Sequence, residues 1–116
     1  MARKEVRNSL AVIYTMQDEL EEAERILVEL VREWPGNLDY RLNLGVVQLQ
    51  REQNASAVQT LESIIETDPR YVRAYRVLGQ AYTNQNLWRE ARGVYARALV
   101  EWPADAVFRN ALNQLP

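Results

Sequence analysis

Residues 72–105 read VRAYRVLGQAYTNQNLWREARGVYARALVEWPAD, and this stretch decides the fold. Its apolar residues follow the spacing i, i+3, i+4, i+7 in two runs, which indicates two amphipathic helices. The polar residues Asn84-Gln85-Asn86 separate the runs. Pro103 ends the second run, because a proline offers no amide donor and disfavours helix in the residue before it. The first run is Tyr75, Leu78, Gly79 and Tyr82, and the second is Trp88, Ala91, Val94, Tyr95, Ala98 and Leu99.

The same helix-turn-helix pattern occurs three times at a period of 34 residues. A proline, a leucine, an alanine and a small residue each recur at this period, in phase with one another. They are Pro35, Pro69 and Pro103; Leu10, Leu44 and Leu78; Ala23, Ala57 and Ala91; and Ala11, Gly45 and Gly79. The chain is therefore predicted to be one all-α domain, with repeats over 4–37, 38–71 and 72–105 and a last helix over about 106–116. The expected helices cover residues 4–17, 21–33, 38–51, 55–67, 72–85, 89–101 and about 105–115.

The recurring small residues have a packing role. A missing or minimal side chain at Ala11, Gly45 or Gly79 lets the second helix of the hairpin approach closely. A glycine inside a helix costs about 1 kcal/mol relative to alanine, so two in-phase glycines indicate that close packing offsets this loss. We expect Gly79→Leu to break its hairpin.

The order Leu-Gly, Tyr, Ala, an aromatic residue, Ala and Pro in residues 72–105 resembles the tetratricopeptide repeat. The resemblance covers three in-phase copies, although Gln48 replaces the tyrosine in the second, and Arg7 and Ala11 replace the usual aromatic residue and glycine in the first. It implies an α-solenoid of antiparallel helical hairpins in a right-handed superhelix of about seven helices. It also implies a concave groove, lined by the first helix of each hairpin.

The last stretch, 106–116, begins as a fourth repeat would and stops after one helix. One face carries Phe108 and Leu112, and the other carries Asn110 and Gln114. A helix with one polar face closes the exposed core at the end of a repeat array, so we interpret it as a cap. A longer array cut at this point is the alternative.

Composition argues against catalysis. The 116 residues include no Cys and no His, so thiolate nucleophiles, Cys-ligated zinc and the commonest general base are excluded. No enzyme activity, cofactor or metal site is predicted. No signal peptide or transmembrane segment is read in the chain, so the cytoplasm is the default location and membrane insertion is not expected. Thirteen arginines against one lysine indicate a GC-rich bacterial genome.

We predict that a protein or peptide partner binds in the concave groove. The groove residues are those on the first helices that point away from the paired helix. Several of them are apolar without being required by the hairpin's own packing, and exposed apolar surface of that kind marks contact sites. The predicted groove consists of Asn8, Val12, Met16, Leu42, Asn43, Val46, Leu49, Arg73, Arg76 and Gln80.

Charge is divided along the chain, with a net of −6 over residues 1–69 and +4 over residues 70–116. A partner with a carboxylate near Arg73 and Arg76 would suit this division, because guanidinium groups grip carboxylates well. The alternative is that these arginines solvate the face or pair with neighbours. One subgroup of the family binds acidic C-termini of heat-shock chaperones through Lys, Asn, Asn, Lys and Arg. That function is not expected, because the matching positions hold Asn8, Val12, Asn43, Arg73 and Val77.

The groove predicts a scaffold or adaptor protein, and two alternatives to that function are open. The same apolar floor, or the terminal helix, could pack on another copy and make a homo-oligomer. The chain could also be the non-catalytic segment of a larger enzyme or of a secretion or assembly complex. The acidic residues 18–22 are interpreted as a turn and helix start rather than a metal site, because carboxylates favour the positive end of a helix. Nucleic acid is not expected, since the sequence pI is about 5.2 and no basic stripe is interleaved with aromatics.

Overall fold

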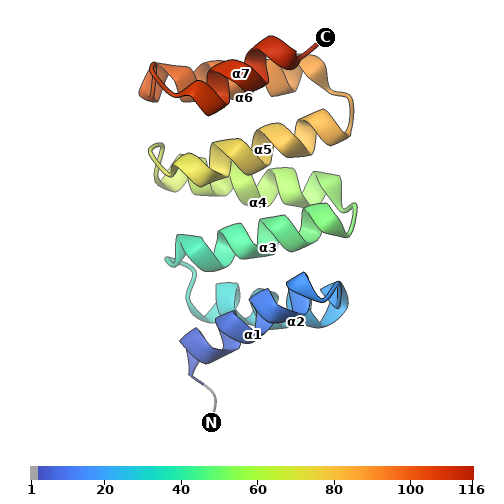
Figure 1. The fold of residues 1–116 in the computed structure, drawn as a ribbon. Coiled ribbons are helices and arrows are strands. Elements are labelled where there is room, and N and C mark those ends of the chain that lie inside the picture. The colour runs from blue at the N-terminus through green and yellow to red at the C-terminus, as the bar shows by residue number, and fades with distance from the viewer. Residues whose placement is uncertain (1–2) are drawn as a thin grey trace. The chain divides into compact units, whose positions relative to one another are not determined.

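The computed structural model describes residues 3–116, and every regular element in that range is an α-helix. The predicted all-α fold is confirmed, and each expected helix end lies within one residue of the observed end. Figure 1 shows the order of the helices along the chain. They are α1 (Lys4–Met16), α2 (Leu20–Glu33), α3 (Leu38–Gln50), α4 (Asn54–Thr67), α5 (Val72–Asn84), α6 (Trp88–Glu101) and α7 (Ala106–Gln114).

The 34-residue period of the sequence recurs in the helix boundaries. Helices α1, α3 and α5 each have 13 residues and begin 34 apart, and α2, α4 and α6 each have 14 residues and begin 34 apart. Helix α7 begins 34 residues after α5. The chain divides into two compact units, one ending at Thr60 and the other beginning at Leu61, so the division lies inside α4.

The turn after each first helix is built in the same way. Asp18, Glu52 and Asn86 have φ values of 62°, 61° and 60°, in the left-handed region that non-glycine residues rarely adopt. The amide of the following residue donates back to the carbonyl five residues earlier, as in the bond of 2.8 Å from Glu19 to Tyr14. This is a Schellman motif, which normally has glycine at the left-handed position.

The proline turns between hairpins also repeat. The amides of Asn37, Tyr71 and Asp105 each donate to the carbonyl three residues earlier at 3.0 Å. The Asn37 side chain then accepts the Tyr40 amide at 3.1 Å, and Asp105 accepts the Phe108 amide at 3.1 Å. Tyr71 makes no such side-chain cap for α5.

The core of the first unit forms where α2 packs against both α1 and α3. The small residues Ala11 and Ala23 have no exposed surface there, and Leu27 and Leu30 of α2 are buried beside them. The core is completed by Tyr40, Leu44 and Val47 of α3.

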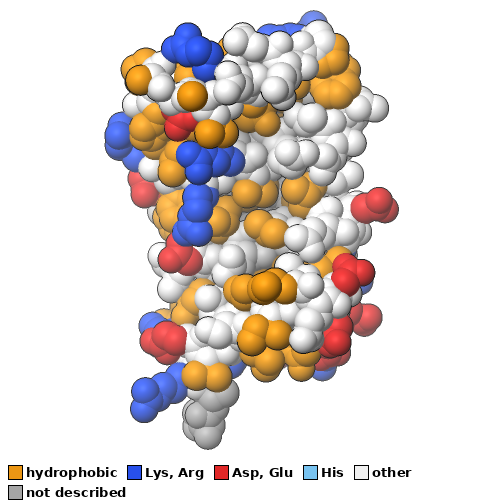
Figure 2. Space-filling model, viewed as in Figure 1, with side chains coloured by type: hydrophobic (Ala, Val, Ile, Leu, Met, Phe, Trp, Pro, Cys, Tyr) orange, Lys and Arg blue, Asp and Glu red, His pale blue; other side chains and the backbone are white. Residues whose placement is uncertain are grey.

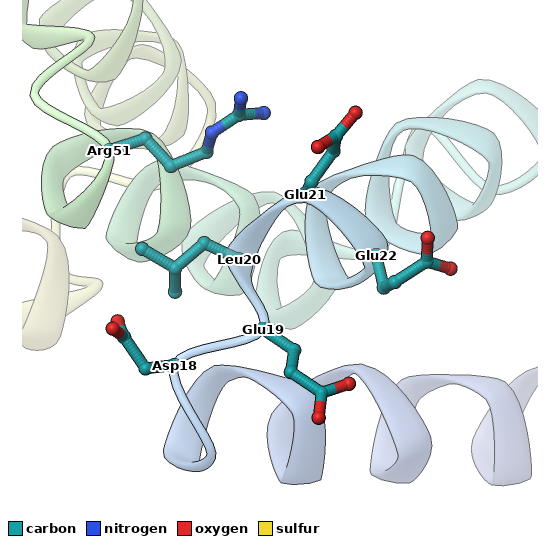
Figure 3. Close-up of a pocket in the computed structure, with 6 residues that line it drawn as sticks. All are labelled: Asp18, Glu19, Leu20, Glu21, Glu22 and Arg51. Atoms are coloured by element: carbon teal, nitrogen blue, oxygen red, sulfur yellow. The ribbon is translucent and has the colours of Figure 1, made fainter.

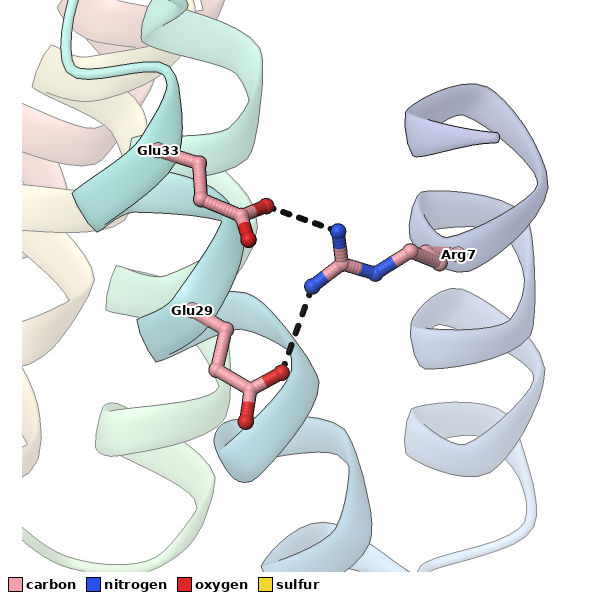
Figure 4. Close-up of polar contacts among 3 residues, drawn as sticks. All are labelled: Arg7, Glu29 and Glu33. Carbon is pink, nitrogen blue, oxygen red and sulfur yellow. Dashed lines mark hydrogen bonds and ion pairs between the residues drawn. The ribbon is translucent and has the colours of Figure 1, made fainter. Parts of the chain in front are cut away.

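Arg7, which occupies the repeat position held by Tyr75 in the third repeat, joins α1 to α2 at the surface. Its guanidinium donates to Glu33 at 2.7 Å and to Glu29 at 3.2 Å (Figure 4). The hydrogen bond to Glu33 is the main cause that raises the pKa of Arg7. An ion pair therefore occupies the repeat position that an aromatic ring fills in the third repeat.

The core of the second unit forms where α6 packs against α5 and α7. Gly79 of α5 faces Tyr95 of α6 so closely that an added Cβ would overlap the ring, with the hydroxyl 2.6 Å away. Phe108 of α7 is fully buried, with ring centroids 6.3 Å from Tyr95 and 6.1 Å from Trp102. The terminal helix is therefore part of this core.

Candidate partner-binding surface

An apolar pocket opens between α1 and α3 in the first unit. Its volume is about 130 Å³, and α1, α2 and α3 all contribute to its wall. Met16 lies at the rim with 81% of its surface exposed, while Leu27, 1% exposed, forms the floor. The lining residues are Val12, Thr15, Met16, Leu27, Asn43 and Val46. We call this feature the α1–α3 pocket. Figure 2 shows hydrophobic side chains at the surface of this part of the chain.

Two asparagines bridge α1 and α3 beside the pocket. The Asn43 side-chain amide donates to the Asn8 oxygen at 2.9 Å. Thr15 donates its hydroxyl to the Ala11 carbonyl at 2.8 Å, so its methyl group is left for the pocket wall. A side-chain amide has two donor hydrogens and two acceptor positions, so each asparagine has further hydrogen-bonding capacity beyond the one bond that joins them. The site thus combines an apolar hollow with adjustable hydrogen-bonding groups.

The structure brings four of the ten predicted groove residues into this pocket: Val12, Met16, Asn43 and Val46. Asn8 joins them through its bond to Asn43, while half-buried Leu49 lies outside the lining. Leu42 corrects the prediction of an exposed apolar floor, because only 4% of its surface is exposed. The helical pattern placed it away from the paired helix, but that pattern does not reveal what else covers a residue.

The sequence does not identify Leu27 as a pocket residue. It lies four residues after Ala23, and this spacing predicts a core residue, which it also is. A position in the pocket floor depends on how α1, α2 and α3 pack together, and no local sequence signal reports that packing.

The other three predicted residues, Arg73, Arg76 and Gln80, lie on α5 in the second unit and are exposed. Arg73 donates to the Tyr71 hydroxyl at 2.8 Å. Arg76 lies 3.6 Å from a carboxylate oxygen of Asp105, and Gln80 donates to Asn84 at 2.7 Å. Each of these side chains therefore has a neighbour within its own unit.

The four acidic residues in 18–22 line a wide depression of about 510 Å³ together with Leu20 and Arg51 (Figure 3). Their carboxylates diverge from one another rather than converging on one point. Glu21 and Glu22 belong to the first turn of α2, where the helix dipole favours negative charge. Across the described residues 3–116, no group of three or more acidic side chains is placed to hold a metal ion.

The family model for the tetratricopeptide repeat matches residues 14–65 and 42–106. The chain belongs to the tetratricopeptide repeat family. It is 32% identical over 103 residues to a peroxisomal targeting signal receptor of Eremothecium gossypii, and 33% identical over 66 residues to one of Saccharomyces cerevisiae. These matches cover 83% and 57% of this chain but only 18% and 11% of the two receptors.

Solved tetratricopeptide repeat domains have the same fold at low identity. The first such domain of Spaghetti (RPAP3), bound to the HSP90 peptide SRMEEVD, has a TM-score of 0.84 at 21% identity, over 96% of this chain and 88% of that one. The Sgt2 domain from Aspergillus fumigatus has a TM-score of 0.84 at 17% identity, over 97% and 76% of the two chains. A membrane-spanning helix is not found, since no helix within residues 3–116 is long and apolar enough.

Proposed function

We propose that this chain is an adaptor that binds a peptide or protein segment at the α1–α3 pocket, with an apolar side chain in the hollow. The observation that carries the proposal is the pocket itself, with its apolar wall and the Asn8–Asn43 bridge beside it. Most ligand sites are concave and largely apolar, with a few placed polar groups. Domains of the family act as interaction modules, and a neighbour of the same fold holds a peptide.

The relatives support a peptide as the class of ligand. Two are named as targeting signal receptors, and the Spaghetti domain is bound to an HSP90 peptide. This chain is not expected to bind the HSP90 peptide itself. Asn8, Val12 and Val77 replace groups that bind acidic termini in the heat-shock subgroup. An acidic group of the partner near Arg73 or Arg76 stays a prediction, as do a cytoplasmic location and a bacterial source.

A second candidate is the same binding role inside a larger protein. The matching region makes up less than a fifth of each receptor, so in those relatives it is one segment of a longer chain. In this alternative the repeats supply recognition and other parts of the protein supply any further activity.

A peptide selection tests the pocket. Random peptides displayed on phage are selected for binding to the native chain. The affinity of each selected peptide is then measured for the native chain and for the variant Val12→Glu/Met16→Glu. Both residues are at least 38% exposed, so the variant should fold. We expect the selected peptides to contain apolar residues. Their affinity for the variant should be at least about tenfold lower than for the native chain, equivalent to about 1.4 kcal/mol. Val100→Glu, at a residue 80% exposed on α6, is the matched control and should bind normally. Equal binding to all three proteins would contradict the proposal.

A further inference from the structure

Helix α1 carries an apolar stripe on a different side from the pocket. Val6, Leu10 and Ile13 are 56%, 41% and 48% exposed. Their spacing of i, i+4 and i+7 places them along one line of the helix. We call these three residues the α1 stripe. Val12 and Met16 are centred about 100° away from the stripe around the same helix, with Met16 next to Ile13 at one edge, so the stripe and the pocket occupy different sides of α1.

The repeat shows what kind of surface the α1 stripe is. The residues 34 positions later are Tyr40, Leu44 and Val47, which are 4%, 7% and 1% exposed. In the first unit these three pack in one cluster with α2. The residues 68 positions after the stripe are Ala74, Leu78 and Ala81, all with no exposed surface. Among α1, α3 and α5, the stripe is therefore the one copy of this face that is open to solvent in the described residues.

The charges at its two ends favour a second copy of this chain as the cover. Arg3 is the N-cap residue of α1, three residues before Val6, and is exposed. Asp18 and Glu19 follow α1 at the other end, and both are exposed (Figure 3). When two copies of α1 pack antiparallel, apolar residues meet at the centre and Arg3 of each copy meets the acidic end of the other. A surface that complements itself in this way forms a two-fold dimer.

We propose that the α1 stripe is a homodimer interface in which two copies of α1 pack antiparallel across a two-fold axis. A contact through one helix of each copy lies at the small end of protein interfaces, so the dimer is weak and forms at high concentration. It leaves both α1–α3 pockets open, and a dimer would hold two partner segments at once. The proposal does not depend on the pocket's function.

Sedimentation velocity from about 10 µM to about 1 mM, the range of a weak complex, tests the dimer. The native chain is expected to shift from monomer to dimer across this range, while Leu10→Glu stays monomeric. Val6→Glu, at a more exposed residue, repeats the test if Leu10→Glu does not fold. Val100→Glu adds the same charge on α6 and should dimerise as the native chain does. The proposal would be overturned by a native chain that stays monomeric, or by an equal loss of dimerisation in Leu10→Glu and Val100→Glu.

A charge exchange tests the antiparallel orientation. Arg3→Glu and Glu19→Arg should each weaken the dimer several-fold, because each places like charges opposite one another. The double variant, with both changes in every copy, should restore native dimerisation. If the double variant is as weak as the singles combined, the ends do not meet and the antiparallel geometry is wrong. The peptide affinity of each variant should stay unchanged, which shows that the charge changes act on the dimer and not on the pocket.

Discussion

Gly79 and Tyr95 form a size-matched pair at the centre of the second unit. A methyl group at Gly79 would overlap the ring, and Tyr95 is only 7% exposed, so the ring has little space to move. Gly79→Ala gains about 1 kcal/mol of helix propensity but overpacks the core. Overpacking costs about 1–3 kcal/mol, so we expect a net loss of up to about 2 kcal/mol in the free energy of unfolding, measured by urea titration.

The first repeat indicates how that loss can be rescued. It carries Ala11 and Leu27 at the positions of Gly79 and Tyr95, and both are buried. Gly79→Ala combined with Tyr95→Leu should therefore be more stable than the sum of the two single changes predicts. Tyr95→Leu alone loses the contact with Phe108 and is the second single variant of this double-mutant cycle. Strictly additive losses would show that the two residues do not compete for space.

Glu52 is the least suited of the three left-handed turn residues. Its φ of 61° crowds Cβ against the backbone, whereas Asn86 at 60° tolerates this region better. Glu52→Gly should raise the free energy of unfolding by about 0.5–1 kcal/mol. Glu52→Gln removes the charge but keeps the strain, so it should change little. If both variants raised the midpoint of thermal unfolding equally, the effect would come from the charge and not from the backbone strain.

At the scale of the helix, Asp105 determines how α7 begins. Its carboxylate accepts the Phe108 amide at 3.1 Å, and Phe108 anchors α7 in the core. Asp105→Ala should lower the free energy of unfolding by about 1 kcal/mol through the lost cap. Asp105→Asn keeps a good capping oxygen and loses only the weak pair with Arg76, so it should lose less. Urea titration of both variants checks this order, and an equal loss would assign the effect to charge.

Helix positions could be predicted closely because three independent signals repeat together: prolines, small residues and apolar spacing. The turns could not be predicted in the same detail. Asp18 and Glu52 carry no glycine signal for a left-handed turn, yet the repeat imposes that conformation on them. A turn that is fixed by the two helices it joins does not need a favourable residue, so propensity does not reveal it.

At the scale of the whole chain, the candidate site was predictable only in part. Helical spacing predicts that Val12, Met16 and Val46 share one surface, and all three line the α1–α3 pocket. The same reasoning placed Leu42 there, although it is 4% exposed. Spacing also cannot distinguish Leu10 from Leu44, which share a register but are 41% and 7% exposed. Burial depends on which helices lie alongside, and that information is not local in sequence.

The pH dependence of stability is a property of the whole chain. Burial is the main cause that raises the pKa of Tyr40, Tyr75 and Tyr82. The folded state therefore holds the phenolic protons more tightly than the unfolded state, whose tyrosines ionise near pH 10. This contribution to stability is complete below about pH 10 and is lost as the pH rises through the folded pKa values. The sequence has no histidine, so no imidazole adds a step near pH 6.5.

We expect the urea midpoint to be similar at about pH 7 and pH 8.5 and lower at about pH 10.5. Ultraviolet absorbance of tyrosinate in the native protein should rise at higher pH than in the urea-unfolded chain. Tyr82→Phe removes one of the three groups and should reduce the fall in midpoint, whereas Tyr75→Phe would also remove its 2.6 Å bond to the Pro69 carbonyl. A fall that is undiminished in Tyr82→Phe would mean that Tyr82 does not contribute, and a constant midpoint up to pH 10.5 would mean that burial does not hold the phenols neutral.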